Sequence, residues 1–244
     1  MDLKKAQDII KETRQNYETI ARHFDQTRQN LWPEFKDLKQ FFQPHNKVLD
    51  FGCGNGRFYE LIKDLTPEYY GVDLSSQLIS FARQKIPQGH FLLVDDNLNL
   101  SFSDNFFDVI TCLATFHHLP SKELELHLLE EFFRVLKPRG YLILTVWDFY
   151  HGKNTKYLVH NYLLGLKHFF FSKNIQYLGF KDFYLPWKDN QAKILTKRYF
   201  HAFTLKELNH LTTRAGFKIL SSQLEPHNKK KDYYNLIIIA QKIN

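Results

Sequence analysis

The stretch that most constrains the fold is residues 48–56, which read VLDFGCGNG. Its apolar beginning is typical of the end of a buried parallel strand, and residues 57–65 after it are predicted to form a helix. Glycine at alternate positions allows positive φ and lets a ligand lie against bare backbone. The free amides at the start of the helix would face that ligand. The stretch therefore predicts a ligand-binding loop between a strand and a helix.

The ligand predicted for this loop carries positive charge. A phosphate-binding P-loop has the pattern Gly-x-x-x-x-Gly-Lys-Ser/Thr, which is absent from the sequence. A dinucleotide fingerprint has Gly-x-Gly-x-x-Gly, whereas this loop has Gly-x-Gly-x-Gly with Asp50 two residues before it. That carboxylate suits S-adenosylmethionine, which has a sulfonium and an ammonium group, better than a pyrophosphate. An ordinary tight turn is the alternative.

Strands and helices are predicted to alternate along the rest of the chain. Further strands are expected at residues 69–74, 90–94, 107–114, 141–147, 218–224 and 233–242. Helices are expected at residues 77–86, 121–136 and 204–216, with a turn at 137–140. This alternation predicts an α/β fold, a Rossmann-like doubly wound seven-stranded sheet. The last two strands are joined directly, so the last strand is expected to be antiparallel.

Polar side chains are predicted at the carboxyl ends of four strands, where ligands bind in sheets of this type. Asp73 could accept from both ribose hydroxyls of an adenosine, although a helix-capping aspartate is the alternative. Asp96 could accept from the adenine amino group, or could belong to an acidic surface loop. With Asp50, His117 and His118, they predict a site along one edge of the sheet.

Two segments lie outside the alternation. Residues 5–24 have apolar positions at helical spacing, and Pro33 suits the first turn of a second helix through Phe42. Residues 151–200 hold nine Lys/Arg and two acids, an excess that equals the net charge of +7 of the whole chain, together with 12 aromatic residues. A helix is predicted there only at residues 155–170. The segment is expected to be either a solvated surface or a contact for a polyanion.

The composition gives no indication of a membrane, secreted or metal-binding protein. No run of about 18 apolar residues is present, and the first residues lack an apolar core of signal-peptide length. Cys53 and Cys112 have no zinc-type spacing and are too few for a disulfide framework. A cytoplasmic protein with no metal site and no membrane contact is therefore expected.

Five motifs between residues 48 and 147 resemble the class I S-adenosylmethionine-dependent methyltransferases, in the group called methyltransferase type 11. They are VLDFGCGNG, GVDLS, DDNLNLSF, FDVITCLATFHHL and LKPRGYLILTVW. Arg139 departs from the Lys-Pro-Gly-Gly turn that is common in the family. The resemblance implies S-adenosyl-L-methionine as the cofactor and methyl transfer as the activity.

Shorter segments resemble the tRNA wobble-uridine methyltransferases, which esterify 5-carboxymethyluridine in the anticodon. They are residues 17–28 with 31–33, 114–119, 185–187 and 198–203. This resemblance implies tRNA as the substrate, and the basic, aromatic residues 151–200 suit contacts with phosphates and splayed bases. Eukaryotic members of that family use a small zinc-binding partner, so a small activator subunit is a candidate partner.

The resemblance implies a role for each matching residue. Those expected to bind the cofactor are Asp50, Gly52, Gly54, Gly56, Asp73, Leu74, Asp96, Asn97, Leu113, Ala114, Arg28 and Trp32. Those expected to bind the substrate are Trp187, Lys193, Lys197, Arg198 and Tyr199. A carboxylate acceptor is ionised at neutral pH and would need only a cation, Arg28 or Arg198, to steer it. A hydroxyl or amine acceptor would need a catalytic base, for which His117 and His118 are the candidates.

The chain is predicted to form a single methyltransferase domain over residues 1–244. A helical cap (1–46) precedes the cofactor-binding core (47–149), a basic and aromatic flap inserted on the substrate side (150–203) and the end of the core (204–244). Two other functions stay open. A small-molecule O-, N- or C-methyltransferase would use the three phenylalanines at 169–171 in an apolar lid. A cofactor-binding protein without catalysis is the third reading, which the acids at the sheet edge disfavour.

Overall fold

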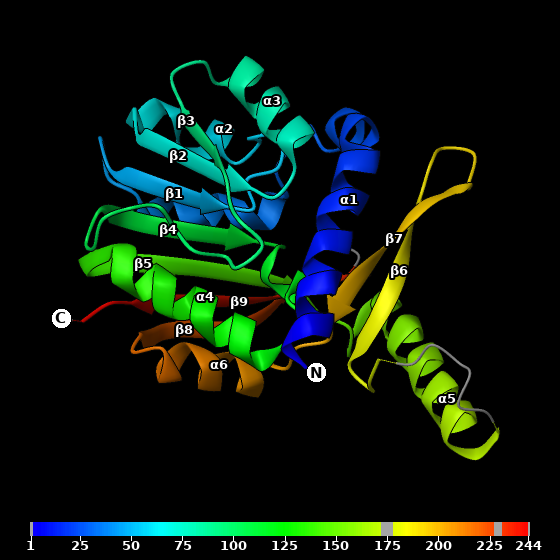
Figure 1. Cartoon of the computed structure of the whole chain (residues 1–244). Helices are drawn as coiled ribbons and strands as arrows, with labels where there is room; N and C mark the ends of the chain where they lie inside the picture. The colour runs from blue at the N-terminus through cyan, green and yellow to red at the C-terminus, as the bar shows by residue number, and fades with distance from the viewer. Residues whose placement is uncertain (1, 172–177, 227–230, 244) are drawn as a thin grey trace.

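The computed structural model describes residues 2–171, 178–226 and 231–243, and its centre is a seven-stranded sheet (Figure 1). The strands are β1 Lys47–Phe51, β2 Glu68–Asp73, β3 His90–Leu93, β4 Phe107–Leu113, β5 Leu136–Trp147, β8 Lys218–Pro226 and β9 Tyr234–Gln241. Their order in the sheet is β3-β2-β1-β4-β5-β9-β8. Strands β1 to β5 pair in parallel, whereas β9 is antiparallel to β5 and β8. The predicted doubly wound sheet with an antiparallel last strand is confirmed.

Helices cover both faces of this sheet. They are α1 Leu3–Thr27, η1 Pro33–Phe41, α2 Tyr59–Ile62, η2 Lys63–Leu65, α3 Ser76–Lys85, η3 Phe116–His118, α4 Lys122–Val135, η4 Gly152–Asn154, α5 Thr155–Phe171 and α6 Leu205–Arg214. Successive side chains of a strand point to opposite faces. Leu49 of β1 therefore packs in the cluster that contains α4 and α6. Its neighbour Val48 packs with η1, α2 and α3 on the other face.

Helix α1 belongs to neither layer and runs past the carboxyl ends of the central strands (Figure 1). It begins after Asp2, whose side chain accepts from the backbone amide of Lys5 at 2.9 Å. Glu18 in its middle accepts from the backbone amide of Gln77, at the start of α3, at 3.1 Å. The predicted N-terminal helix is thus longer than residues 5–24, and it forms a cover over the edge where the polar residues were expected.

The insertion contains a β-hairpin that the sequence analysis did not predict. Strands β6 (Asp182–Lys188) and β7 (Ile194–His201) pair antiparallel and lie on the far side of α1 from the sheet (Figure 1). Alternate residues Phe183, Leu185 and Trp187 are buried, as expected for a strand with one covered face. The helix predicted at residues 155–170 is confirmed as α5. The side chains of residues 168–171 lie outside the described part of the chain, so the suggested lid has no structural account.

Two local predictions were wrong. The helix expected at residues 57–65 is reduced to α2 and the 3-10 turn η2, because no side chain caps its start. The turn expected at residues 137–140 is a distorted part of β5, in which Arg139 has φ 66°. Among the described residues, no helix is long and apolar enough to cross a membrane.

Candidate active site

The glycine loop after β1 has a backbone that other residues would strain. The φ values are 73° at Gly52, 55° at Gly54 and 78° at Gly56. A Cβ atom on Gly52 would lie 2.2 Å from Oγ1 of Thr115, so a side chain cannot be placed there without rearrangement. On Gly54 it would lie 3.2 Å from the ring of Phe24 on α1. The loop therefore presents bare backbone to the space beneath α1, as the sequence predicts.

Asp50 ends β1 inside the protein. Its two carboxylate oxygens accept from the hydroxyls of Tyr69 at 2.6 Å and Thr111 at 2.8 Å, both on neighbouring strands. Burial raises the pKa of Asp50 to about 6, against the lowering effect of these two hydrogen bonds. The nearby charge of Asp73 raises it further. The two neighbouring strands thus hold the Asp50 carboxylate in a buried position, where its ionised form is unfavourable.

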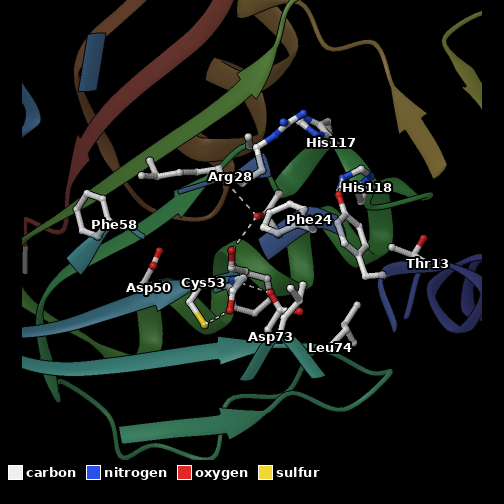
Figure 2. Close-up of a pocket in the computed structure, with 18 of the residues that line it drawn as sticks. Thr13, Phe24, Arg28, Asp50, Cys53, Phe58, Asp73, Leu74, His117 and His118 are labelled. Carbon is white, nitrogen blue, oxygen red and sulfur yellow. Dashed lines mark hydrogen bonds between the residues drawn. The ribbon is translucent and has the colours of Figure 1, made fainter. Parts of the chain in front are cut away.

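Asp73 ends β2 and faces the same space (Figure 2). Its oxygens accept from the backbone amides of Gly54 and Ser75, each at 2.9 Å, so that the carboxylate joins the glycine loop to the start of α3. Ser75 itself caps α3. Burial raises the pKa of Asp73 to about 6. Within the described parts of the chain, neither Asp73 nor Asp50 forms an ion pair, so a cationic ligand would offset the burial of both.

A pocket lies between the strand ends and α1 (Figure 2). Of the residues predicted to bind a cofactor, those that line it are Arg28, Trp32, Asp50, Gly52, Gly54, Asp73, Leu74, Leu113 and Ala114. Its free volume is about 110 Å³, below the roughly 300–1,000 Å³ of most small-molecule sites. Phe24 and Tyr17 of α1 are part of its wall. Helix α1 therefore closes one side of this pocket.

Three residues predicted to bind the cofactor do not line this pocket. Gly56 lies at the end of the loop. Asp96 pairs with Arg14 of α1 at 2.7 Å, and Asn97 accepts from the side chain of Gln7 at 3.2 Å. Helix α1 thus contacts the side chains of both residues, whereas the contacts expected with adenine were those of the Asp96 carboxylate and the Asn97 backbone, which stay predictions.

The two candidate catalytic histidines are buried and engaged. Nδ1 of His117 accepts from the backbone amide of Trp147 at 3.1 Å. Nδ1 of His118 lies 2.6 Å from the carbonyl oxygen of Tyr199, and its Nε2 lies 2.8 Å from the hydroxyl of Tyr17. Burial lowers the pKa of both, in His118 to about 3 with a further contribution from the charge of Arg198. The lowered pKa makes both rings weak bases, and the acceptor nitrogen of each is already hydrogen-bonded, so neither is suited to accept a proton from a substrate.

Three arginines face the pocket without a carboxylate partner. They are Arg28 from the end of α1, Arg57 after the glycine loop and Arg198 from β7. Among the residues described, no acidic group forms an ion pair with any of them. Burial and then the charge of Arg198 lower the pKa of Arg28, and burial and then Arg28 lower that of Arg57 to about 10. Sequence analysis missed Arg57, although it follows the loop directly.

A larger cleft of about 1150 Å³ adjoins the pocket. Both cavities are lined by Arg28, Leu31, Trp32, Arg57, Trp147, Trp187 and Arg198. The guanidinium groups of Arg28 and Arg198 lie 4.9 Å and 4.6 Å from the centre of the Trp187 ring. This contact is favourable for cations on an indole face. The shared wall is therefore aromatic and positively charged.

The remaining predicted substrate residues lie on the hairpin. Lys193 and Lys197 are exposed, Lys193 in the turn before β7 and Lys197 on β7, the strand that carries Arg198. Tyr199 is fully buried, and its hydroxyl donates to Asp182. We therefore do not retain Tyr199 as a residue on which a base could stack, because a stacked base needs an open ring face.

Comparison with known proteins agrees with this site. A model described as a methyltransferase domain matches residues 49–144. A putative methyltransferase of Encephalitozoon cuniculi is 30% identical over 210 residues, which are 86% of this chain and 88% of that protein. This chain belongs to the S-adenosylmethionine-dependent methyltransferases. S-adenosylmethionine is its cofactor, and the chemistry of the pocket lining suits it, because the bare loop and two carboxylates with no ion-pair partner among the described residues favour a ligand with cationic groups.

Relatives named for a tRNA activity are also similar. The tRNA (carboxymethyluridine(34)-5-O)-methyltransferase of Schizosaccharomyces pombe is 26% identical over 248 residues, covering 93% of this chain and 95% of that protein. The protein of that name from Arabidopsis thaliana is 34% identical over 131 residues, 54% of this chain and 31% of that protein. The chain spans about a third of the length of the first curated relatives it matches.

Solved structures share the fold. A SAM-dependent methyltransferase from Methanosarcina mazei has a TM-score of 0.68 at 24% identity, covering 88% of this chain and 99% of that chain. The complex between the Haloferax volcanii Trm112 methyltransferase activator and a putative methyltransferase gives a TM-score of 0.64 at 15% identity, covering 95% of this chain and 98% of that chain. Both likenesses concern the fold alone.

Proposed function

We propose that this methyltransferase esterifies the carboxylate of 5-carboxymethyluridine at the wobble position of tRNA. The observation that carries the proposal is the wall between the two cavities. There, Arg28 and Arg198 flank Trp187 and have no acidic partner among the described residues. A guanidinium group can bind a planar carboxylate through two parallel hydrogen bonds. The names of the tRNA-modifying relatives support the same acceptor.

A carboxylate acceptor is consistent with the state of the histidines. When bound, S-adenosylmethionine supplies an electrophilic methyl group, whose transfer to a carboxylate oxygen gives a methyl ester. The acceptor is ionised at neutral pH, so no side chain has to remove a proton. The acceptor nitrogens of His117 and His118 are already hydrogen-bonded, which would hinder an enzyme that needs a base to methylate an amine or a hydroxyl. The remaining task of the protein is to orient the acceptor and exclude water.

The direct experiment uses tRNA isolated from cells that lack this protein. The purified enzyme is incubated with that tRNA and S-adenosylmethionine, and the nucleosides are analysed by mass spectrometry. We expect 5-methoxycarbonylmethyluridine to appear and to revert to 5-carboxymethyluridine after mild alkali, because an ester is hydrolysed by base. Methylation of a different nucleoside, or of no nucleoside, would contradict the proposal.

The hairpin is proposed to bind the phosphates of the anticodon arm through Lys193 and Lys197, which are exposed on it. Replacing both with Glu should weaken tRNA binding and reduce the slope of log K against log[salt] by about 1.4 to 1.8. The control variant replaces two lysines outside the hairpin with Glu, namely Lys122 at the start of α4 and Lys218 at the start of β8. Equal slopes for the two double variants would exclude the hairpin as the RNA-binding surface.

A small-molecule methyltransferase is the second candidate, and one feature favours it. Helix α5 carries an exposed apolar stripe of Val159, Leu163 and Leu166, and Tyr157 of the same helix lines the large cleft. If the enzyme binds no tRNA at low salt, this stripe becomes the place to look for an apolar acceptor.

An activator subunit is also part of the proposal. A solved neighbour is a methyltransferase bound to the Trm112 activator of Haloferax volcanii. Co-purification of the tagged enzyme from its own cells, followed by mass spectrometry, tests whether a small protein binds it in a fixed ratio.

A further inference from the structure

A chain of three hydrogen bonds connects η3, α1 and β7 at the shared wall. Nδ1 of His118 lies 2.6 Å from the carbonyl oxygen of Tyr199. Nε2 of the same ring lies 2.8 Å from the hydroxyl of Tyr17, and Nη1 of Arg198 donates to that hydroxyl at 3.2 Å. His118 stands at the edge of the pocket in Figure 2. None of these bonds involves the cofactor loop.

The groups at the two ends of this series of hydrogen bonds determine which atom donates in each bond. A backbone carbonyl can only accept, so Nδ1 of His118 must carry the ring proton. Nε2 is then an acceptor, and the hydroxyl of Tyr17 must donate to it. The lone pairs of that hydroxyl are left for Arg198, whose guanidinium can only donate. The pKa of His118, lowered to about 3 by burial and by the charge of Arg198, keeps the ring in this neutral form across the working range of pH.

Arg198 is buried among contacts, but one of its N–H groups has no hydrogen-bond acceptor among the described residues. It is 6% exposed, and its Nε is buried without a hydrogen-bond partner. The guanidinium lies 4.6 Å from the centre of the Trp187 ring, and the side chain lines both cavities. A planar cation with free N–H groups, fixed on one side by Tyr17 and against one ring face, is prepared to bind an anion that enters from the cleft.

We infer that Tyr17 and His118 are positioning residues that orient Arg198, and that Arg198 binds the carboxylate of the acceptor. The inference rests on the proposed function and makes it more specific. His118 acts through Tyr17 on the orientation of Arg198 and does not remove a proton. The site should therefore prefer a carboxylate to the neutral amide of the same shape, which offers one acceptor oxygen instead of two.

The decisive variant is Tyr17→Phe, assayed on an anticodon stem-loop that carries 5-carboxymethyluridine. The ring, which packs edge-on against Phe24 and His118, is retained, so the variant should fold. We expect KM for the stem-loop to rise about tenfold with kcat within about twofold and with unchanged cofactor affinity. Binding of a stem-loop with the corresponding amide should change by less than about twofold. His118→Leu should match Tyr17→Phe, whereas His118→Gln, which keeps an acceptor oxygen for Tyr17, should recover most of the affinity.

Two readouts separate positioning from base catalysis. The pH profile of kcat should show no ionisation between about pH 6 and 8, because a carboxylate acceptor needs no base. Nitrogen-15 shifts of His118 should report a neutral ring protonated at Nδ1 from about pH 5 to 8. A fall in kcat with unchanged KM in Tyr17→Phe, or a ring protonated at Nε2, would overturn the inference alone. If the wild-type enzyme forms no ester on the stem-loop, the proposed function fails and the inference falls with it.

Discussion

The role of Asp73 can be tested by replacing it with Asn, which removes the charge and keeps the shape. Asp73 accepts from the amides of Gly54 and Ser75, each at 2.9 Å. Each carboxylate oxygen has a second lone pair, and these are the ones we expect a ribose to use. An Asn side chain has one acceptor oxygen, so its NH₂ group would face one of the two backbone amides.

The expected loss follows from these bonds. Hydrogen bonds to a charged group contribute about 1.5–3 kcal/mol. Losing this contribution should weaken S-adenosylmethionine binding by roughly 10- to 150-fold. The backbone amide left without an acceptor should cost about 1–3 kcal/mol of folding free energy. For a chain of this size, each 1 kcal/mol lowers the melting temperature by about 2–4 °C.

Calorimetric titration with S-adenosylmethionine measures the first effect and thermal melting the second. The matched control is Asp64→Asn, which removes the same charge from an exposed residue paired with Lys39. A capping aspartate without a ligand role would lower the melting temperature and leave the affinity unchanged. A folded Asp73→Asn protein that binds the cofactor within about twofold of wild type would therefore refute the assignment.

Two further predictions concern the same loop. The pKa values of Asp50 and Asp73 are each raised to about 6. Cofactor affinity should therefore weaken as pH falls through 6, and cofactor binding near that pH should release protons. An affinity that does not depend on pH would contradict this prediction. Because these pKa values are raised in the folded state, the stability of the cofactor-free protein should fall as pH rises from about 4 to 6. Gly52→Ala puts a Cβ atom 2.2 Å from Oγ1 of Thr115 at a residue whose φ is 73°. We expect the folding free energy to fall by on the order of 2 kcal/mol, which should lower the melting temperature by several degrees. An unchanged melting temperature would show that the loop relaxes freely.

The features that sequence predicted well depend on local patterns. The doubly wound sheet, the glycine loop and the placement of Asp50 and Asp73 at adjacent strand ends follow from short motifs and from the alternation of strands and helices. The geometry of a parallel sheet then brings the strand ends together without further information. This is why two carboxylates 23 positions apart in the chain could be assigned to one pocket, which both of them line.

The features that sequence missed depend on packing between distant segments. A helical cap and a flap were predicted, but the contact between α1 and the hairpin was not, since no local rule says that residues near 17 meet residues near 198. The alternation of Phe183, Leu185 and Trp187 was a usable strand signal, but Pro186 and the many aromatic residues obscured it. Arg57 and Tyr17 gain their meaning only from their neighbours in space. The prediction that Tyr199 binds the substrate likewise overlooked that one face of a hairpin must be covered.

The hairpin that carries Arg198 is attached to the core by a buried ionic group, and this separates its pH dependence from that of the cofactor loop. His201 in β7 contacts Asp182 at 2.7 Å and Glu207 of α6 at 3.3 Å, and Glu207 also pairs with Lys181 at 2.6 Å. Burial lowers the pKa of His201, but these hydrogen bonds raise it to about 9. Because the pKa of His201 is raised on folding, His201 contributes its full stabilisation of the folded state below its ordinary pKa of 6.5. That contribution is lost as pH rises through about 9. The pKa of Glu207 is raised by burial and lowered by His201 and Lys181, to about 2, so its contribution is lost only in strong acid. Between pH 5 and 6.5 the ion pairs of His201 and Glu207 are therefore retained while Asp50 and Asp73 titrate, although buried Glu125 beside them, whose pKa burial raises to about 7, titrates over the same interval. A change in cofactor affinity over that interval reports on the two carboxylates, and a change in acceptor binding that appears only towards pH 9 reports on the hairpin.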